Sequence, residues 1–405
     1  MSVAMEVLPE KSKRLCIDMD SDTGELVAKQ QLEIAPPKSY KKITPSLAVA
    51  ARSNNQRPGW VSKLSTNTTT LDMELINLTT WDKFDIFNVK DLTKGHPLQF
   101  VGMALIDKFD LFEKLSLRRD VVSKFFECLE DMYNDNPYHN STHAADVAQT
   151  VGCMLGNDNI LLEHLTDMEV FCVIFAAIIH DVGHPGFTND FLIRTRAPEA
   201  IIYNDTHVNE NGHLAEAFRL LLRPDINFVS HFSNEEWSFF RKTVIDVVIA
   251  TDMVGHSALL KDFQQVLQKQ GPTLSSWATA QRSKLLELIV HVADISNPLK
   301  PVKLSVAWAQ RVVTESWNQG DQEISRGLSV SPLCDRTKVN VPQMQISFLN
   351  GFAQPSLELL RIFMPSTVST AMSCGSLTRG YWEDVGSLPN AHQDPKKLFS
   401  AAVGL

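Results

Sequence analysis

Histidine occurs together with aspartate or glutamate in four segments of the sequence. These are 138–146 (YHNSTHAAD), 180–186 (HDVGHPG), 209–213 (NENGH) and 291–294 (HVAD). Neutral imidazole nitrogens and carboxylate oxygens are the ligands that Zn²⁺, Mn²⁺ and Mg²⁺ take from proteins. One histidine on a helix is most often packed or exposed without any ligand role. Several such segments in one chain therefore predict a metal site, which no single segment does.

Two apolar stretches end in these polar groups. The run Val170–Ile179 leads directly into His180 and Asp181, and the stretch 285–293 leads into Asp294. Both stretches predict buried helices that deliver polar side chains at their ends. Burying an imidazole beside a carboxylate is unfavourable without partners, and a cation supplies the partner. A buried network of histidine and aspartate hydrogen bonds is the alternative that the residues leave open.

Other catalytic classes have less support. His139 and His143 are four residues apart, as in the H-E-x-x-H motif of zinc proteases, but Asn140 stands where the general base would be. The sequence has no G-x-S-x-G elbow, Walker loop or dinucleotide fingerprint. The six cysteines form no C-x-x-C pair, so we expect reduced thiols in an intracellular protein.

Composition narrows the class of protein. The chain has 405 residues, 44% of them hydrophobic and 21% charged, with a net charge of −9. These values exclude wholesale disorder and argue against a protein that coats nucleic acid or an anionic membrane. An anionic substrate stays open, because a bound cation reverses the local charge. No secretory signal is visible, and the longest apolar run is too short to span a bilayer, so we expect a cytoplasmic protein without a transmembrane segment.

Periodicity predicts an all-α fold. Residues 1–75 are Pro-, Lys- and Ser-rich and predict a disordered or regulatory extension, and 366–405 predict a flexible tail. The domain between them, 76–365, has almost no strand-like alternation. Its apolar residues recur at helical spacing in 120–133, 143–155, 167–180, 211–223, 235–250, 279–293, 303–318 and 342–362. Thr166 and Ser233 are expected helix caps. We therefore expect helices in several layers around a central site.

An ordered series of motifs extends this interpretation. It comprises YHNxxHAAD (138–146), HDxxHPG (180–186), Glu210-Asn211, Thr251-Asp252-Met253, HVADISNP (291–298), Gln319-Gly320-Asp321, SPLCD (331–335) and QISF (345–348). Over about 78–362 the chain closely resembles the catalytic domain of class I 3′,5′-cyclic nucleotide phosphodiesterases, most of all the cAMP-preferring branch. The resemblance implies a compact multi-helix bundle of the HD metal-phosphohydrolase type around a binuclear metal site.

The resemblance also implies a role for each matching residue. The ligands of a tightly held Zn²⁺ would be His143, His180, Asp181 and Asp294. Asp181 would bridge to a second cation, Mg²⁺ or Mn²⁺, whose water shell would be lined by His184, Asn189, Glu210, His213, Thr251 and Asp252. His139 matches the general acid. The base pocket would hold Tyr138, Asn297, Gln345 and Phe348.

The implied reaction suits these residue types. A hydroxide held by two metals would attack the cyclic phosphodiester, and His139 would protonate the departing 3′ oxygen. The expected substrate is a small cyclic nucleotide, cAMP in preference to cGMP, and the product is the nucleoside 5′-monophosphate. Gln345 offers both a donor and an acceptor to the base. No nucleic-acid partner is expected, and a homodimer is left open.

Four positions depart from the family pattern. Gly183 stands at a tolerant position, and Gly212 replaces an imidazole that the family usually carries before His213. Ser305 replaces a Tyr that orients the glutamine in cAMP-selective relatives, and Ser316 replaces an aromatic residue. Gly212, Ser305 and Ser316 suggest one alternative, a cyclic-nucleotide-binding or scaffold protein with weak catalysis. Another alternative, an HD phosphohydrolase for a different nucleotide, is disfavoured by Gln345 and Phe348.

Overall fold

The computed structural model describes residues 17–19, 26–28, 70–388 and 399. The chain divides into two units, Met1–Arg57 and Pro58–Leu405. In the first unit, strands β1 (Ile17–Met19) and β2 (Leu26–Ala28) pair in antiparallel register, with Ile17 opposite Ala28. Both strands fall within the predicted N-terminal extension, most of which lies outside the described residues.

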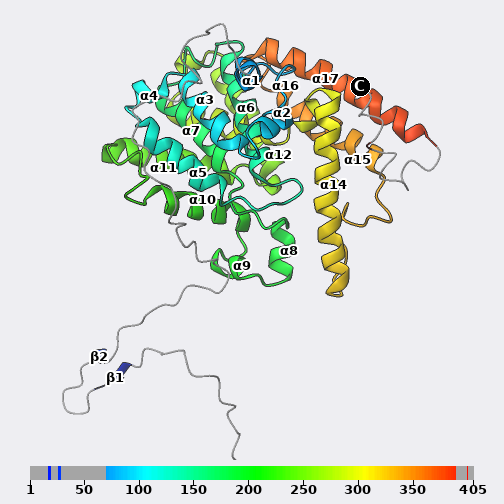
Figure 1. Cartoon of the computed structure of the whole chain (residues 1–405), viewed down its shortest axis with the longest axis horizontal. Helices are drawn as coiled ribbons and strands as arrows, with labels where there is room; N and C mark the ends of the chain where they lie inside the picture. Colours follow the sequence, from blue (N-terminus) through cyan, green and yellow to red (C-terminus); the bar gives the residue numbers. More distant parts are fainter. Residues whose placement is uncertain (1–16, 20–25, 29–69, 389–398, 400–405) are drawn as a thin grey trace, which may run out of the picture. The chain divides into compact units, whose positions relative to one another are not determined.

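The described part of the second unit is built from helices (Figure 1), which confirms the predicted all-α class. In chain order these are α1 (Thr70–Ile76), α2 (Ile86–Leu92), α3 (Pro97–Lys108), α4 (Leu111–Lys114), α5 (Arg119–Glu130), α6 (Ser141–Gly156), α7 (Asp167–Ile179), α8 (Asn189–Arg194), α9 (Pro198–Ile202), α10 (Val208–Leu221), α11 (Asn234–Ile249), the 3₁₀ helix η1 (Met253–Gly255), α12 (His256–Gln270), the 3₁₀ helix η2 (Leu274–Ser276), α13 (Thr279–Asp294), the 3₁₀ helix η3 (Asn297–Leu299), α14 (Val302–Ser325), α15 (Val341–Phe348), the π-helix η4 (Leu349–Ala353), α16 (Gln354–Glu358) and α17 (Pro365–Ser387).

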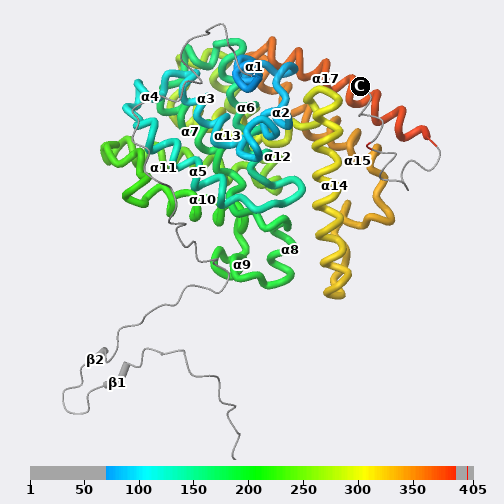
Figure 2. The backbone as a smooth tube through the Cα atoms, viewed as in Figure 1, coloured from blue at the N-terminus to red at the C-terminus, as the bar shows by residue number. Residues whose placement is uncertain are grey.

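Helices α6, α7 and α13 form the centre of this unit and pack against one another (Figure 2). Every residue of α7 from Val170 to Ile179 is buried, as its unbroken apolar sequence predicts. Thr166 caps α7 in a reciprocal capping box with Glu169, and Ser233 caps α11 in the same way. Because α7 and α13 end in polar residues, their buried ends bring those residues into the interior.

A second, smaller core lies between α14, α15 and α17. Val313 of α14, Val341 of α15 and Trp382 of α17 are buried there, together with Phe399. The predicted flexible tail, 366–405, is therefore wrong over 366–387. Its serines and glycines suggested a tail, but an apolar face that packs on neighbouring helices stabilises α17 as a helix.

The predicted helical segment 342–362 is continuous helix only as far as Glu358, and residues 359–362 form turns. Within the helical part the hydrogen-bonding pattern changes. The π-helix η4 separates α15 from α16, and Pro355 follows in the first turn of α16. Proline has no N–H to donate, so it interrupts the regular ladder of hydrogen bonds. Such π segments are frequent at functional sites, and this one directly follows Phe348.

Two further expectations concern membranes and thiols. Among the described helices, none is by itself long and apolar enough to cross a membrane, and the one pair that qualifies together, Asn234–Ile249 with Met253–Gln270, is bent by 80°. Cys128, Cys153, Cys172, Cys334 and Cys374 are free thiols, and Cys16 lies outside the described residues. Burial raises the pKa of Cys153 to about 12.

Candidate active site

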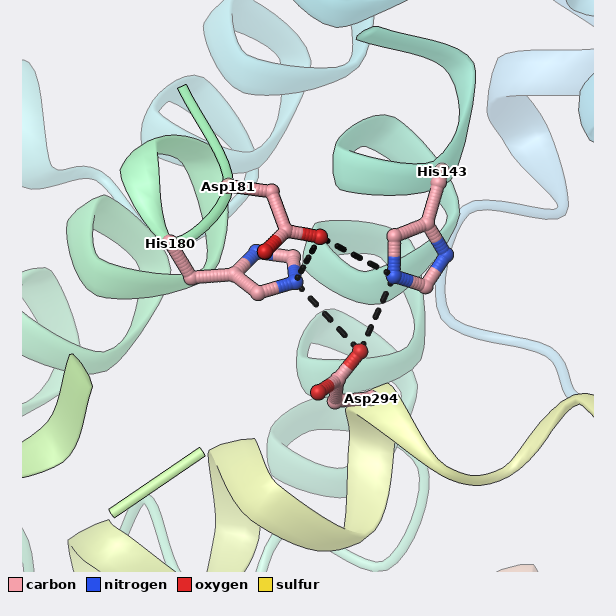
Figure 3. Close-up of side chains that lie close together, drawn as sticks. All are labelled: His143, His180, Asp181 and Asp294. Atoms are coloured by element: carbon pink, nitrogen blue, oxygen red, sulfur yellow. Dashed lines mark hydrogen bonds and ion pairs between the residues drawn. The ribbon is translucent and has the colours of Figure 1, made fainter. Parts of the chain in front are cut away.

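Four side chains from three helices point toward one another (Figure 3). His143 lies in the first turn of α6, His180 and Asp181 follow the last residue of α7, and Asp294 is the last residue of α13. The Nε2 atom of His143 lies 2.9 Å from Asp294 Oδ1 and 3.6 Å from Asp181 Oδ2. The Nε2 atom of His180 lies 3.2 Å from Asp181 Oδ2 and 3.4 Å from Asp294 Oδ1. The structure thus brings the four predicted ligands together.

The chemistry of this cluster fits a cation. Nδ1 of His180 donates to the carbonyl of Ala177 at 2.9 Å, which leaves Nε2 as the nitrogen that faces the carboxylates. Among the described residues, His180 Nε2 and Asp181 Oδ2 are buried without a hydrogen-bond partner. Burial alone lowers the pKa of His180, but the charges of Asp181 and Asp294 raise it well above its usual value. A divalent cation among these atoms would satisfy both lone pairs and balance the two carboxylates.

A second pair of imidazoles lies beside Asp181. His213 donates from Nδ1 to the carbonyl of Val182 at 2.7 Å, and its Nε2 lies 3.6 Å from Asp181 Oδ1. Nδ1 of His184 accepts a hydrogen bond from the N–H of Gly186 at 3.0 Å. Burial lowers the pKa of His213 to about 4 and holds that of His184 well below its usual value. Both rings are therefore neutral at pH 7 and can serve as ligands or hydrogen-bond partners around Asp181.

A third group of predicted residues meets around Asn189. The amide of Asn189 donates to Glu210 Oε2 at 3.0 Å and to Asp252 Oδ2 at 3.4 Å. Burial raises the pKa of Glu210 to about 7, and the neighbouring charge of Asp252 adds to the shift. The hydroxyl of Thr251 instead donates to the carbonyl of Val248 at 2.8 Å. The structure thus brings three of these four residues into hydrogen-bonding contact.

His139 is fixed by a residue of α14. Nδ1 of His139 donates to Glu315 Oε1, and the other oxygen of Glu315 accepts from the backbone N–H of Tyr138 at 2.8 Å and of His139 at 3.1 Å. Burial alone would lower the pKa of His139, but the charges of Asp181 and Glu315 raise it to about 9. The ring is therefore protonated near neutral pH, and it is stacked on His184 at 3.9 Å between centroids.

A cavity of about 1000 Å³ opens beside His139 and Asp294. Gln345 and Phe348 of α15 also line it, and the ring of Phe348 is stacked on Phe352 at 5.3 Å. A volume of this size is typical of a pocket for a small organic ligand. The same cavity is therefore lined by a flat aromatic ring, an amide and Asp294 of the four-residue cluster.

Tyr138 and Asn297, which line this cavity, belong to a chain of hydrogen bonds that leads to buried residues. The hydroxyl of Tyr138 donates to Asn297 Oδ1 at 2.6 Å, and Asn297 Nδ2 donates to Asp146 Oδ2 at 3.1 Å. Lys300, which is 2% exposed, lies 3.4 Å from Asp146 and donates to Gln149 Oε1 at 3.0 Å. Because each amide atom of Asn297 has its own partner, the orientation of this amide is fixed.

Comparison with known proteins identifies the family. A family model described as 3′5′-cyclic nucleotide phosphodiesterase matches residues 138–374. The chain belongs to this family. Every residue that the sequence predicts for the site, from Tyr138 to Phe348, falls inside the matched range.

Relatives of the chain include phosphodiesterases whose names state different substrate specificities. It is 37% identical over 295 residues to 3′,5′-cyclic-AMP phosphodiesterase 4C of Rattus norvegicus, covering 71% of this chain and 54% of the relative. It is 36% identical over 326 residues to the dual specificity calcium/calmodulin-dependent 3′,5′-cyclic nucleotide phosphodiesterase 1C of Mus musculus, covering 80% of this chain and 45% of the relative. The chain thus spans about half the length of these curated relatives.

A solved structure shares the fold. The phosphodiesterase domain of the RhoPDE fusion protein from the choanoflagellate Salpingoeca rosetta matches with a TM-score of 0.70 and 27% sequence identity, over 76% of this chain and 95% of that chain. The arrangement of helices around the cluster of histidines and aspartates is therefore a phosphodiesterase-domain arrangement.

Sequence reasoning missed Glu315 and Lys300. Glu315 is seven residues after Trp308, so it lies on the buried stripe of α14, and an acidic residue at such a position is the signal that could have drawn attention to it. The sequence gives less indication of a role for Lys300, because Pro298 and Pro301 on either side predict a connection between two helices. In this phosphodiesterase domain Glu315 lines the cavity and holds His139, whereas Lys300 contacts Asp146, the partner of Asn297.

Gly212, one of the departures from the family pattern, does not remove the imidazole next to Asp181. A Cβ atom at Gly212 would meet only the ring of Tyr203, at 3.9 Å. The residue that faces Asp181 from α10 is His213, which is present. The phosphodiesterase site therefore keeps the imidazole next to Asp181 despite the glycine.

Proposed function

We propose that this protein hydrolyses 3′,5′-cyclic nucleotides to nucleoside 5′-monophosphates. The observation that carries the proposal is the cluster of His143, His180, Asp181 and Asp294, with its buried unpartnered nitrogen and oxygen. Asp294 also lines a cavity that is lined by His139. We assign these four residues as ligands of Zn²⁺. Asp181 would be shared with Mg²⁺ or Mn²⁺, with His184 and His213 beside it and Asn189, Glu210, Thr251 and Asp252 around its water shell.

Divalent cations bound there would activate water and neutralise charge on the phosphate. The side chains of this chain supply the remaining steps. His139 is positioned by Glu315 and protonated near neutral pH, so it can donate a proton to the departing 3′ oxygen. A cyclic phosphate with its 3′ oxygen toward His139 would extend its base into the cavity toward Phe348 and Gln345.

Base recognition in this proposal rests on four residues. The ring of Phe348 offers a stacking surface, and Tyr138 and Asn297 form the wall next to it. Gln345 is 7% exposed, and none of the described residues hydrogen-bonds its amide. The hydroxyl of Ser305, which lines the same cavity, is also buried without a partner among the described residues. An unfixed amide can present either edge, which supports acceptance of both cAMP and cGMP. We propose that cAMP is preferred because relatives of this chain include cAMP phosphodiesterases.

The test is side-by-side kinetics with cAMP and cGMP on protein stripped with a chelator and reloaded with Zn²⁺ and Mg²⁺ or Mn²⁺. We expect 5′-monophosphate as the product of both substrates, with the higher kcat/KM for cAMP. Binding of cAMP by calorimetry to the loaded protein without product would favour a binding or scaffold protein. Faster hydrolysis of nucleoside triphosphates would favour a different phosphohydrolase. The cytoplasmic location and the homodimer stay predictions from the sequence.

A further inference from the structure

A separate group of possible metal ligands lies at the start of α10. His207 directly precedes this helix, Glu210 is in its first turn, and Asp252 directly precedes η1. Nδ1 of His207 lies 2.8 Å from Asp252 Oδ2, and one ligand atom from each of the three residues lies within 4.8 Å of the others. This group shares no residue with the cluster around His143.

The charges in this group are unbalanced. Asp252 and Glu210 are both buried, with 10% of the Asp252 side chain and 9% of Glu210 exposed. Among the described residues, His207 is the only basic side chain paired with Asp252, and none is paired with Glu210. Asp181 adds a further negative charge and contributes to the raised pKa of Glu210. Buried carboxylates that lack basic partners are the setting in which proteins hold cations.

One distance in this group is close to one in the principal cluster. The distance from nitrogen to oxygen is 2.8 Å between His207 and Asp252, and 2.9 Å between His143 and Asp294. Asn189 donates to both carboxylates of the new group and so fixes their oxygens, as outer partners of metal ligands do. The side chain of His207 is 34% exposed and lines a surface groove of about 790 Å³, so ions and water can reach it from solvent.

We propose that His207, Glu210 and Asp252 bind a further divalent cation, in addition to those of the proposed catalytic cluster. An imidazole with two carboxylates suits Zn²⁺ or Mn²⁺, whereas Mg²⁺ prefers oxygen ligands alone. Water from the groove would complete the coordination. This site goes beyond the proposed function, but it shares Glu210 and Asp252 with the proposed water shell of the second catalytic cation, so the test must separate the two.

The test is metal content measured by mass spectrometry after equilibrium dialysis of the chelator-stripped chain against Zn²⁺, and separately against Mn²⁺. We expect His207→Ala to bind one equivalent less than the unchanged protein, whatever number the other sites hold. His207→Asn, which can still hydrogen-bond Asp252, should show the same loss and guards against misfolding of the alanine variant. His164→Ala, which removes an exposed histidine elsewhere, should lose nothing.

A second arm separates this site from the catalytic cluster. In an Asp181→Ala background, which removes the carboxylate shared by the proposed catalytic cations, adding His207→Ala should still remove one equivalent. Equal metal content with and without His207 would overturn the proposal and leave His207 and Asp252 as a hydrogen-bonded pair. A difference that disappears in the Asp181→Ala background would also overturn it, because His207 would then act through Asp181.

Discussion

Lys300 is a buried charge outside the proposed metal ligands, and its removal is predicted to destabilise the fold. Its ammonium group lies 3.4 Å from Asp146, donates to Gln149, and lies 5.1 Å from the ring centre of Trp81. Lys300 and Asp146 are each 2% exposed. In Lys300→Met the methionine fills similar volume, but Asp146 keeps its charge with Asn297 as its remaining side-chain donor. The variant therefore isolates the effect of an uncompensated buried carboxylate.

The expected loss of stability follows from this burial. Removing one partner of a buried ion pair destabilises a protein by about 3–5 kcal/mol, because the remaining charge has no compensation. With an unfolding entropy of about 2.1 cal/mol/K per residue, a unit of roughly 320 residues should then melt about 4–8 °C lower. A matched control is Lys303→Met, three residues along, where the lysine is 69% exposed and pairs with Asp85. An exposed pair contributes at most about 1 kcal/mol, so the control should melt within about 2 °C of the unchanged protein.

The assay is thermal unfolding of metal-loaded protein followed by circular dichroism. Adding Asp146→Asn to Lys300→Met should restore part of the melting temperature, because an uncharged amide no longer needs the ammonium group. A melting temperature for Lys300→Met equal to that of Lys303→Met would refute the reasoning that this pair is buried and ionic.

Three further predictions concern the cavity and the pH dependence of stability. Glu315→Gln should lower kcat by about 10–100-fold. It should also move the alkaline limb of the pH profile of kcat to lower pH, because losing the carboxylate lowers the pKa of His139, and an unchanged profile would contradict this. Ser305→Tyr, by holding the amide of Gln345, should raise the ratio of cAMP to cGMP kcat/KM by about 2–10-fold, and an unchanged ratio would count against that contact. Burial lowers the pKa of His256 in the folded protein. When the pH drops below the ordinary pKa of histidine, the unfolded chain therefore binds more protons than the folded chain, and the free energy of unfolding decreases. His256→Gln should flatten the decline in melting temperature between about pH 7 and pH 5, and an equally steep decline would speak against it.

The parts of the site that are encoded locally could be predicted from the sequence. Thr166 and Glu169 mark the start of α7, and the apolar run after them fixes which face is buried, so His180 and Asp181 were expected at its inner end. Asp294 follows from the same pattern in α13. Caps and periodicity act within a few residues, which is why they can be identified in one sequence.

The parts that depend on distant contacts could not be predicted. Glu315 meets His139 across 176 residues, and Lys300 meets Gln149 across 151 residues. No local pattern specifies such a pair, because it arises from the packing of whole helices. Helix α17 is a similar case, since its weak helix formers are stabilised by burying Val368 and Trp382 against other helices.

The central claim is that His143, His180, Asp181 and Asp294 hold the cation on which turnover depends. The most direct measurement is metal content and cAMP turnover on the same sample of Asp294→Ala, with thermal unfolding as the control for folding. We expect the tightly bound metal and the turnover to be lost together, while the protein still melts cooperatively. Turnover equal to that of the unchanged protein in a sample that has lost this metal would contradict the account.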